Sequence, residues 1–163
     1  SGEFPRKSGS GQVGIVPYRA YQTQDVELVV AAGNDGLFRS LCQVLQHPQW
    51  ADDPRFASNP DRVQHGSVLY ALIEAEMLKR TGAEWIELLE AAGIPCAPVQ
   101  NVQQMLESPQ IKALGILQPV PGASVPMIVT PISFDGQRKP CESAAPALGA
   151  HTHEVFPSTE VRA

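Results

Sequence analysis

Apolar residues recur at helical spacing in several stretches, most regularly in residues 81–95. There they follow one another at i, i+3, i+4 and i+7, which places them on one face of a helix. These positions are Trp85, Leu88, Leu89 and Ala92. Thr81 and Glu84 have the spacing of a capping box, while Gly93 and Pro95 are typical of a helix end. The pattern therefore predicts a capped helix with a sharp stop, followed by a short proline-rich crossing.

Three further helices are predicted from the same spacing. The first covers residues 36–46 behind a cap at Asn34, and its expected buried face is Leu37, Leu41, Val44 and Leu45. The second opens at Asn59 and runs to about Lys79, although Gly66 weakens its first half. Its apolar face is Leu69, Leu72, Ile73, Glu76 and Met77. Ser108-Pro109 opens the third and Gly115 closes it.

Strands are predicted where Val, Ile and Tyr gather between turn residues. Residues 15–22 and 27–32 form one such pair around a turn at 23–25, with Pro17 near the start of the first strand. Residues 115–120 and 125–130 form a second pair around Pro121-Gly122. This order of elements predicts an α+β fold in which a small antiparallel sheet packs with several helices.

Length and charge narrow the class of protein. The chain has 163 residues, enough for one domain with a core, and 12 basic against 17 acidic residues give a net charge of −5. No cluster of basic residues suggests a nucleic-acid partner, and no apolar run approaches the roughly 20 residues of a membrane span. Cys42, Cys96 and Cys141 are odd in number and have no short pairing, which favours the reducing cytoplasm.

Cysteine and histidine offer two candidates for chemistry. Cys96 could act as a nucleophile, but no local motif ties a base to it, and a small apolar residue in a tight crossing is the simpler interpretation. His151 and His153 could bind a metal, yet their spacing from Cys141 matches no common site. Solvated histidines are the simpler interpretation there, so we predict no metal site.

Carboxylates and glycines offer two more candidates. Asp52, Asp53, Asp61, Glu74 and Glu76 could serve acid–base chemistry, but nothing marks any of them as buried. The Gly-x-Gly of residues 9–11 lacks the third glycine and the following helix of a dinucleotide fingerprint. Motif chemistry alone thus predicts no catalytic residue in this chain.

Five stretches in a fixed order nevertheless resemble a known family. They are VPYRAYQTQD, AAGNDGLFRSLCQVL, DDPRFASNPDRVQH, WIELLEAAGIPCAPVQNVQQMLESPQI and PALGAHTHEVF, and together they span about residues 9–156. Their order and gaps resemble those of the family III CoA-transferases, also called CaiB/BaiF proteins. One departure is Asp25-Val26, where the family usually has Asp-Gly, and this puts the turn type in doubt.

The resemblance implies a part of a longer enzyme that moves CoA between an acyl-CoA and a carboxylic acid. It assigns residues 9–140 to the small domain and 141–163 to the segment that returns to the large domain, with 1–8 as a tag, linker or otherwise flexible end. The family's catalytic aspartate and most groups that hold the nucleotide of CoA belong to the large domain. The chain alone is therefore expected to be inactive.

The same resemblance implies the partners. Acyl-CoA would be bound in the full-length parent, with CoA as a substrate and no tightly bound cofactor, and the parent would form a homodimer in the cytoplasm. Two alternatives stay open: a stand-alone binding or scaffold domain with this fold, and a fragment of an enzyme like 2-methylacyl-CoA racemase.

One set of site residues can be carried over. Gly9, Ser10, Gly11 and Gln12 stand where formyl-CoA transferase has a glycine-rich loop that closes over the thioester. They could form the same lid, or they could be only a flexible linker. The resemblance also suggests that residues 9–18 and 95–99 face the acyl pocket.

Overall fold

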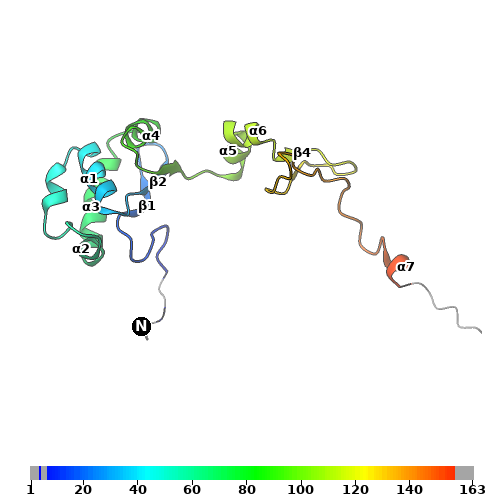
Figure 1. Ribbon diagram of the computed structural model, residues 1–163, viewed down its shortest axis with the longest axis horizontal. Coiled ribbons are helices and arrows are strands. Elements are labelled where there is room, and N and C mark those ends of the chain that lie inside the picture. The colour runs from blue at the N-terminus through cyan, green and yellow to red at the C-terminus, as the bar shows by residue number, and fades with distance from the viewer. Residues whose placement is uncertain (1–3, 5–6, 157–163) are drawn as a thin grey trace, which may run out of the picture. The chain divides into compact units, whose positions relative to one another are not determined.

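The computed structural model describes residue 4 and residues 7–156 (Figure 1). The chain divides into two compact units, one up to Val99 and one from Gln100 onward. The length alone suggested a single domain, but the core described below belongs entirely to the first unit. The predicted limits at residues 8/9 and 140/141 remain predictions.

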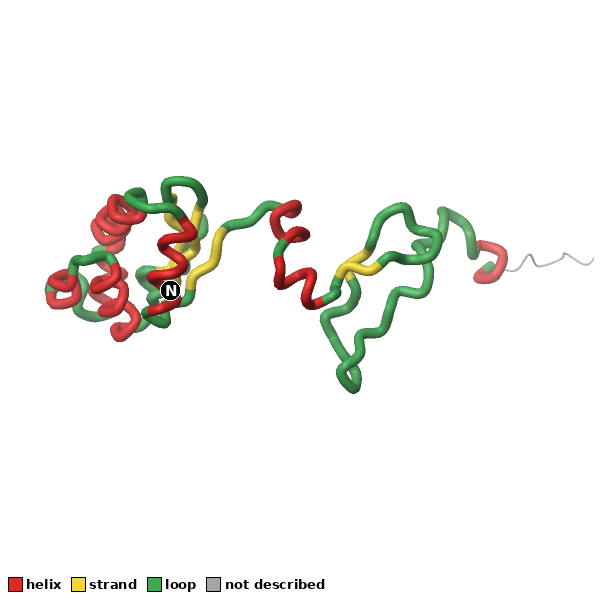
Figure 2. The backbone as a smooth tube through the Cα atoms, turned by 90° about the horizontal axis from the view of Figure 1, so that it is seen from above, coloured by secondary structure: helices red, strands yellow, loops and turns green. Residues whose placement is uncertain are grey.

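The first unit joins a three-stranded sheet to a group of helices (Figure 2). The strands lie in the order β1-β2-β3, and both pairings are antiparallel. Its elements are β1 (Tyr18–Gln22), β2 (Glu27–Ala31), α1 (Asp35–Val44), the 3-10 helix η1 (Pro48–Asp52), α2 (Asn59–Gln64), α3 (Gly66–Met77), α4 (Gly82–Ala91) and β3 (Cys96–Pro98). This arrangement confirms the predicted α+β class.

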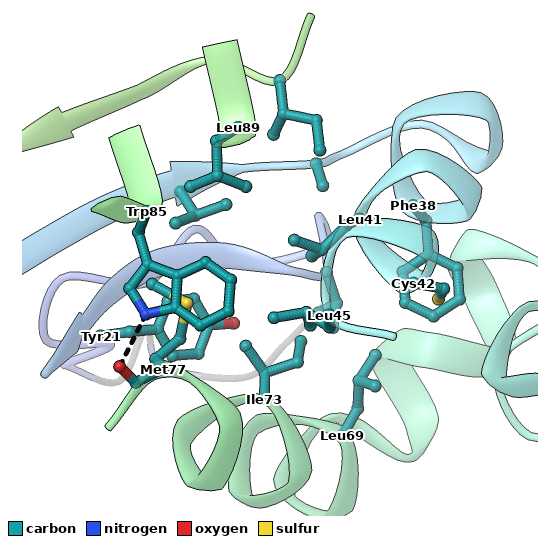
Figure 3. Close-up of a cluster of buried hydrophobic side chains, with 14 of the residues drawn as sticks. Tyr21, Phe38, Leu41, Cys42, Leu45, Leu69, Ile73, Met77, Trp85 and Leu89 are labelled. Atoms are coloured by element: carbon teal, nitrogen blue, oxygen red, sulfur yellow. Dashed lines mark hydrogen bonds between the residues drawn. The ribbon is translucent and has the colours of Figure 1, made fainter. Parts of the chain in front are cut away.

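The core lies between one face of this sheet and helices α1, α3 and α4. Leu28 and Val30 of β2 are fully buried there. Figure 3 shows side chains from the three helices converging on each other, with Leu41 from α1, Ile73 from α3 and Leu89 from α4 among them. The Trp85 indole donates a hydrogen bond of 2.8 Å to the carbonyl of Met77, so its one polar atom is paired inside the core.

Two predicted helix faces need correction. In α1 the buried residues are Phe38, Leu41 and Cys42, with Leu45 buried at its C-cap, whereas Leu37 and Val44 are only partly buried. The apolar stripe was broader than four positions, and the Arg62 guanidinium of α2 lies over the Phe38 ring. In α4 Leu88 is 38% exposed, because Trp85 and Leu89 already fill the space beneath that helix.

The single helix expected over residues 59–79 is two helices. Ser58, not Asn59, caps α2, and His65 leaves helical geometry before α3 begins at Gly66. The break falls where glycine makes a continuous helix least favourable. Because α2 is a separate helix, its orientation is not fixed by α3, and its buried Arg62 side chain reaches the segment before β1.

The ends of α4 are formed as predicted. Thr81 and Glu84 make both hydrogen bonds of the capping box. Gly93 has a φ of 70°, and the amides of Gly93 and Ile94 each donate 2.9 Å hydrogen bonds back to Glu90 and Leu89. This is the double bond of a Schellman ending. The proline-rich crossing that follows is itself a strand, β3, which the sequence pattern did not predict because it is three residues long.

The turn at Asp25-Val26 forms without a positive φ at Val26. The Val26 amide donates to the Thr23 hydroxyl at 3.1 Å, and the Thr23 amide donates to the Val26 carbonyl at 2.9 Å. Valine is therefore accommodated in this turn without left-handed backbone geometry.

The second unit contains short elements. They are α5 (Val102–Glu107), α6 (Pro109–Leu114), β4 (Leu117–Gln118), β5 (Met127–Ile128) and α7 (Thr152–Val155). The predicted caps at Ser108 and Gly115 are confirmed, and β4 pairs with β5 inside the predicted strand ranges. Asp135 and Gly136 form a tight turn with positive φ at both positions. Among the described residues, no helix is long and apolar enough to cross a bilayer.

Candidate functional site

The sheet of the first unit has a second face that no core helix covers. Alternation along β2 sends Leu28 and Val30 into the core, so Val29 and Ala31 lie on the opposite face. Ala20 pairs with Val29 and Tyr18 pairs with Ala31, which places both β1 residues on this open face. Tyr18 is 38% exposed. The open face is therefore apolar, and small side chains occupy much of it.

A shallow depression of about 200 Å³ is formed on this side of the sheet. Its lining consists of Tyr18, Val29, Ala31, Pro95, Cys96 and Ala97. The register explains its composition, because Ala97 of β3 pairs with Val29 of β2 and Ala31 pairs with Tyr18. The fold thus brings together the two segments expected to face a pocket, 9–18 and 95–99, with β2 between them.

The glycine-rich loop (Gly9–Gln12) lies along the free edge of β1. The Gln12 amide donates to the Tyr18 carbonyl at 3.1 Å, and the Ala20 amide donates to the Ser10 hydroxyl at 3.2 Å. Both groups of β1 point away from β2, so the loop satisfies an edge that would otherwise be unpaired. The loop adjoins the depression through Tyr18.

Glycine is needed in this loop for two different reasons. Gly9 has a φ of 62°, which L side chains rarely adopt. A side chain on Gly11 would press against the Ser8 carbonyl and lie beside the backbone of Tyr18. The loop is therefore a defined turn docked on the sheet.

Sequence reasoning missed the β2 contribution to the depression. Leu28, Val29, Val30 and Ala31 form an unbroken apolar run, which is typical of a strand with both faces covered. Within the first unit as described, helices cover only the face of Leu28 and Val30. That run was the available signal that the second face also has a role.

Cys96 lies at the depression, but its environment does not favour a nucleophile. Burial raises the pKa of its thiol, and the nearby Glu90 carboxylate raises it further. Both effects disfavour the reactive thiolate. Cys42 is more deeply buried, and burial raises its pKa to about 12. These surroundings support the interpretation of Cys96 as a small apolar residue, and its pairing with Val30 puts its side chain on the core side of the sheet.

Most of the candidate carboxylates are engaged in ion pairs and caps. Asp53 binds Arg55 at 2.7 Å, and these hydrogen bonds lower the pKa of Asp53 to about 2. Glu76 contacts Lys79 at 2.7 Å and His47 at 3.0 Å. Asp61 accepts a hydrogen bond from the capping residue Ser58. None of these three lines the depression.

The two C-terminal histidines lie in or beside α7. His151 precedes the helix, His153 is within it, and both are exposed. No group of three or more His, Cys, Asp or Glu side chains in the described part of the chain is arranged to hold a metal ion.

The sequence of this chain matches a known protein family and several known enzymes. Residues 1–152 match the model of CoA-transferase family III. The chain is 32% identical over 166 aligned residues to an acetyl-CoA:oxalate CoA-transferase from Acetobacter aceti, covering 99% of this chain and 42% of that protein. It is 33% identical to a succinate–glutarate CoA-transferase from Agrobacterium fabrum, covering 98% of this chain and 41% of the relative.

A solved structure of the same family has a similar fold. A CaiB/BaiF family protein from Brucella suis superposes with a TM-score of 0.74 at 33% identity, over 95% of this chain and 40% of that one. The chain belongs to CoA-transferase family III. It spans about two-fifths of the length of these relatives.

Proposed function

We propose that this chain forms the small domain of a family III CoA-transferase that moves CoA between an acyl-CoA and a carboxylic acid. The observation that carries the proposal is the depression on the open sheet face, with the glycine-rich loop at its rim. Family membership supplies the reaction class, and two relatives are named as transferases acting on dicarboxylic acids or their CoA thioesters.

In this proposal the open face is a wall of the acyl pocket. Its alanines and Val29 leave room for an acyl chain, and its apolar lining keeps water from the thioester. Excluding water favours attack by the acceptor carboxylate over hydrolysis. Gly9, Ser10, Gly11 and Gln12 form the lid over the same site.

The covalent chemistry is assigned to the part of the enzyme that this chain does not cover. A carboxylate nucleophile must be positioned beside the thioester carbonyl. Asp53, Asp61 and Glu76 are held in ion pairs or caps and do not line the depression. CoA is then a substrate rather than a resident cofactor, and the chain alone has no turnover.

The setting of the parent is part of the same proposal. Cys42, Cys96 and Cys141 are free thiols in the part of the chain that the structure describes, which supports a cytoplasmic location for the parent. Exposed apolar side chains in the second unit, including Ile128, Ile132 and Phe134, support association within a homodimeric parent.

A chimera tests this function. This chain would replace the matching segment of the Acetobacter aceti transferase, and acetyl-CoA:oxalate exchange would be measured for the chimera and for the isolated chain. We expect transfer by the folded chimera and none by the chain alone. A folded chimera that binds acyl-CoA without transferring CoA would contradict the proposal.

The depression itself is tested by filling it in that chimera. We expect Ala31→Phe to lower kcat/KM roughly tenfold or more, because a displacement of about 1 Å at a reacting centre is costly. Ala75→Phe is the matched control, since Ala75 is exposed on α3. Equal activities for the two variants would show that the depression does not face the substrate.

A further inference from the structure

The Asn59 side chain joins α2 to the segment that connects the glycine-rich loop with β1. Its Oδ1 accepts a hydrogen bond of 3.1 Å from the Val16 amide. Its Nδ2 donates one of 2.9 Å to the Gly14 carbonyl. A single carboxamide therefore holds two backbone groups on either side of Ile15, across more than forty residues of sequence.

Arg62, one turn later in α2, holds the other polar group of Val16. Its Nε donates to the Val16 carbonyl at 2.7 Å, and its guanidinium also donates to the Phe56 carbonyl at 3.0 Å and the Asp35 carboxylate at 2.8 Å. Arg62 is 0% exposed and lies over the Phe38 ring. A buried charge with these partners is costly to move, so α2 is a fixed base beneath the segment.

Helix formation does not account for Asn59. The cap of α2 is Ser58, whose hydroxyl accepts from the Asp61 amide, and Asn59 is the first residue inside the helix. Asparagine is a weak helix former, so this position gains little from it locally. Its polar atoms are used for the distant segment instead.

The contacts of the loop itself are few. Gln12 bonds to Tyr18, Ser10 accepts from Ala20, and Gly11 closes a local turn onto Ser8. Downstream the chain passes Gly14, which has a φ of 84°, and reaches the buried Val16. Apart from β1 itself, the element that holds this segment is therefore α2, through the Asn59 contact.

We propose that Asn59 is the positioning residue of the glycine-rich loop. By holding Gly14 and Val16 it sets where residues 9–12 lie beside Tyr18, at the rim of the depression. The role of that loop at an acyl site rests on the function proposed above, whereas its positioning by Asn59 is measurable without any substrate.

Amide hydrogen exchange resolved by NMR on the purified chain tests the proposal. The amides of Gln12 and Ala20 report on loop docking, because their acceptors are Tyr18 and Ser10 and neither touches Asn59. Amides inside α3, which neither variant site caps, report on general stability. The variants are Asn59→Ala, the conservative Asn59→Asp and the control Asn34→Ala.

Each variant removes a defined set of contacts. Asn59→Ala removes both, and Asn59→Asp keeps an acceptor for Val16 but loses the donor to Gly14. Asn34→Ala makes the same chemical change elsewhere, because Asn34 caps α1 through a 2.8 Å bond from the Leu37 amide. It does not touch the loop segment.

We expect Asn59→Ala to speed exchange at Gln12 and Ala20 roughly tenfold relative to the helix amides, equivalent to about 1.4 kcal/mol. Asn59→Asp should lie between it and the wild type, and Asn34→Ala should leave the ratio unchanged. If the amides of Gln12 and Ala20 exchange in Asn59→Ala at the same rate as in the wild type, the proposal is overturned. A rise shared equally by the helix amides would also overturn it, because it would mean a purely structural role.

These outcomes separate the proposal from the function on which it builds. Loss of transfer by the chimera described above would leave the exchange result unaffected. If the chimera transfers CoA but Asn59→Ala leaves loop exchange unchanged, only the positioning role of Asn59 is refuted, and the proposed function stands.

Discussion

The Tyr21 hydroxyl is buried without a hydrogen-bond partner among the described residues. The ring itself is well placed, tilted against Tyr70 and beneath the Arg19 guanidinium at 5.6 Å. Burial, with the neighbouring Tyr70 second, raises the pKa of Tyr21 well above its usual value. The hydroxyl therefore stays neutral and costs desolvation without a compensating bond.

We expect Tyr21→Phe to be neutral or to raise the free energy of unfolding by up to about 1 kcal/mol, because it removes only the unpaired group. Chemical denaturation of the two proteins measures this. Tyr18→Phe is the control, since the exposed Tyr18 should show little change. A loss of more than about 1 kcal/mol in Tyr21→Phe would mean that the hydroxyl is paired in solution.

Cys96 gives a second test at the level of the residue. Because its raised pKa leaves little thiolate near neutral pH, we expect slow alkylation of Cys96 in the folded chain. The same thiol in denaturant, followed by mass spectrometry, gives the unprotected rate. Faster alkylation in the folded chain than in the denatured one would instead indicate an activated nucleophile.

At the level of elements, the β1–β2 turn is attached to the start of α4. Asp25 accepts a 2.7 Å hydrogen bond from the Gly82 amide and a 3.0 Å bond from the Thr23 hydroxyl. These bonds, the Gly82 amide first, lower the pKa of Asp25 below its ordinary 3.8. A carboxylate at a helix N-terminus is also favoured by the helix dipole.

This attachment should depend on pH. Because the pKa of Asp25 is lower in the folded state, its contribution is complete above about pH 3.8 and is lost as the pH falls through the folded pKa. We expect Asp25→Asn to be less stable than the wild type near neutral pH, with the difference shrinking toward strong acid. A difference in unfolding free energy that grows on acidification would contradict this attachment.

Gly82 gives an independent test of the same junction. A side chain added to Gly82 would overlap the Cγ2 methyl of Val26. We expect Gly82→Ala to destabilise the fold although alanine is the better helix former by about 1 kcal/mol. The double variant with Val26→Ala should recover most of that loss in thermal unfolding. If Gly82→Ala alone stabilises the chain, the two elements do not pack this closely.

Local hydrogen bonds account for what the sequence could predict. The caps at Thr81, Asn34 and Ser108 each bond to a residue three positions away, and all three were predictable. The α1 face was misjudged because Leu37 and Phe38 both fit the helical period. Phe38 is the buried one, and the Arg62 guanidinium of α2, distant in sequence, lies over its ring. The break before Gly66 depends on where α2 packs, which no local pattern encodes.

The candidate site was less predictable than the fold for the same reason. The loop at residues 9–12 and the segments beside it were indicated by family resemblance. The depression exists because β3, Cys96–Pro98, pairs with β2 nearly seventy residues earlier in the sequence. The Asn59 and Arg62 contacts to Val16 span 43 and 46 residues and have no motif of their own.

At the scale of the whole molecule, we propose that the wall of the acyl site and the groups that bind CoA lie in different parts of the parent enzyme. The first unit provides an apolar depression with a docked loop, and most of its candidate carboxylates are engaged elsewhere. The nucleotide and the covalent step are assigned to the part of the parent that the chain does not cover. The chain should therefore recognise neither CoA nor its thioesters tightly by itself.

Calorimetric titration of the purified chain with CoA and acetyl-CoA at low salt tests this separation most directly. We predict no saturable heat up to millimolar ligand. Saturable binding tighter than about 100 µM, or about −5.5 kcal/mol, would contradict it. That result would mean that the chain has a CoA site of its own and acts as a stand-alone binding domain.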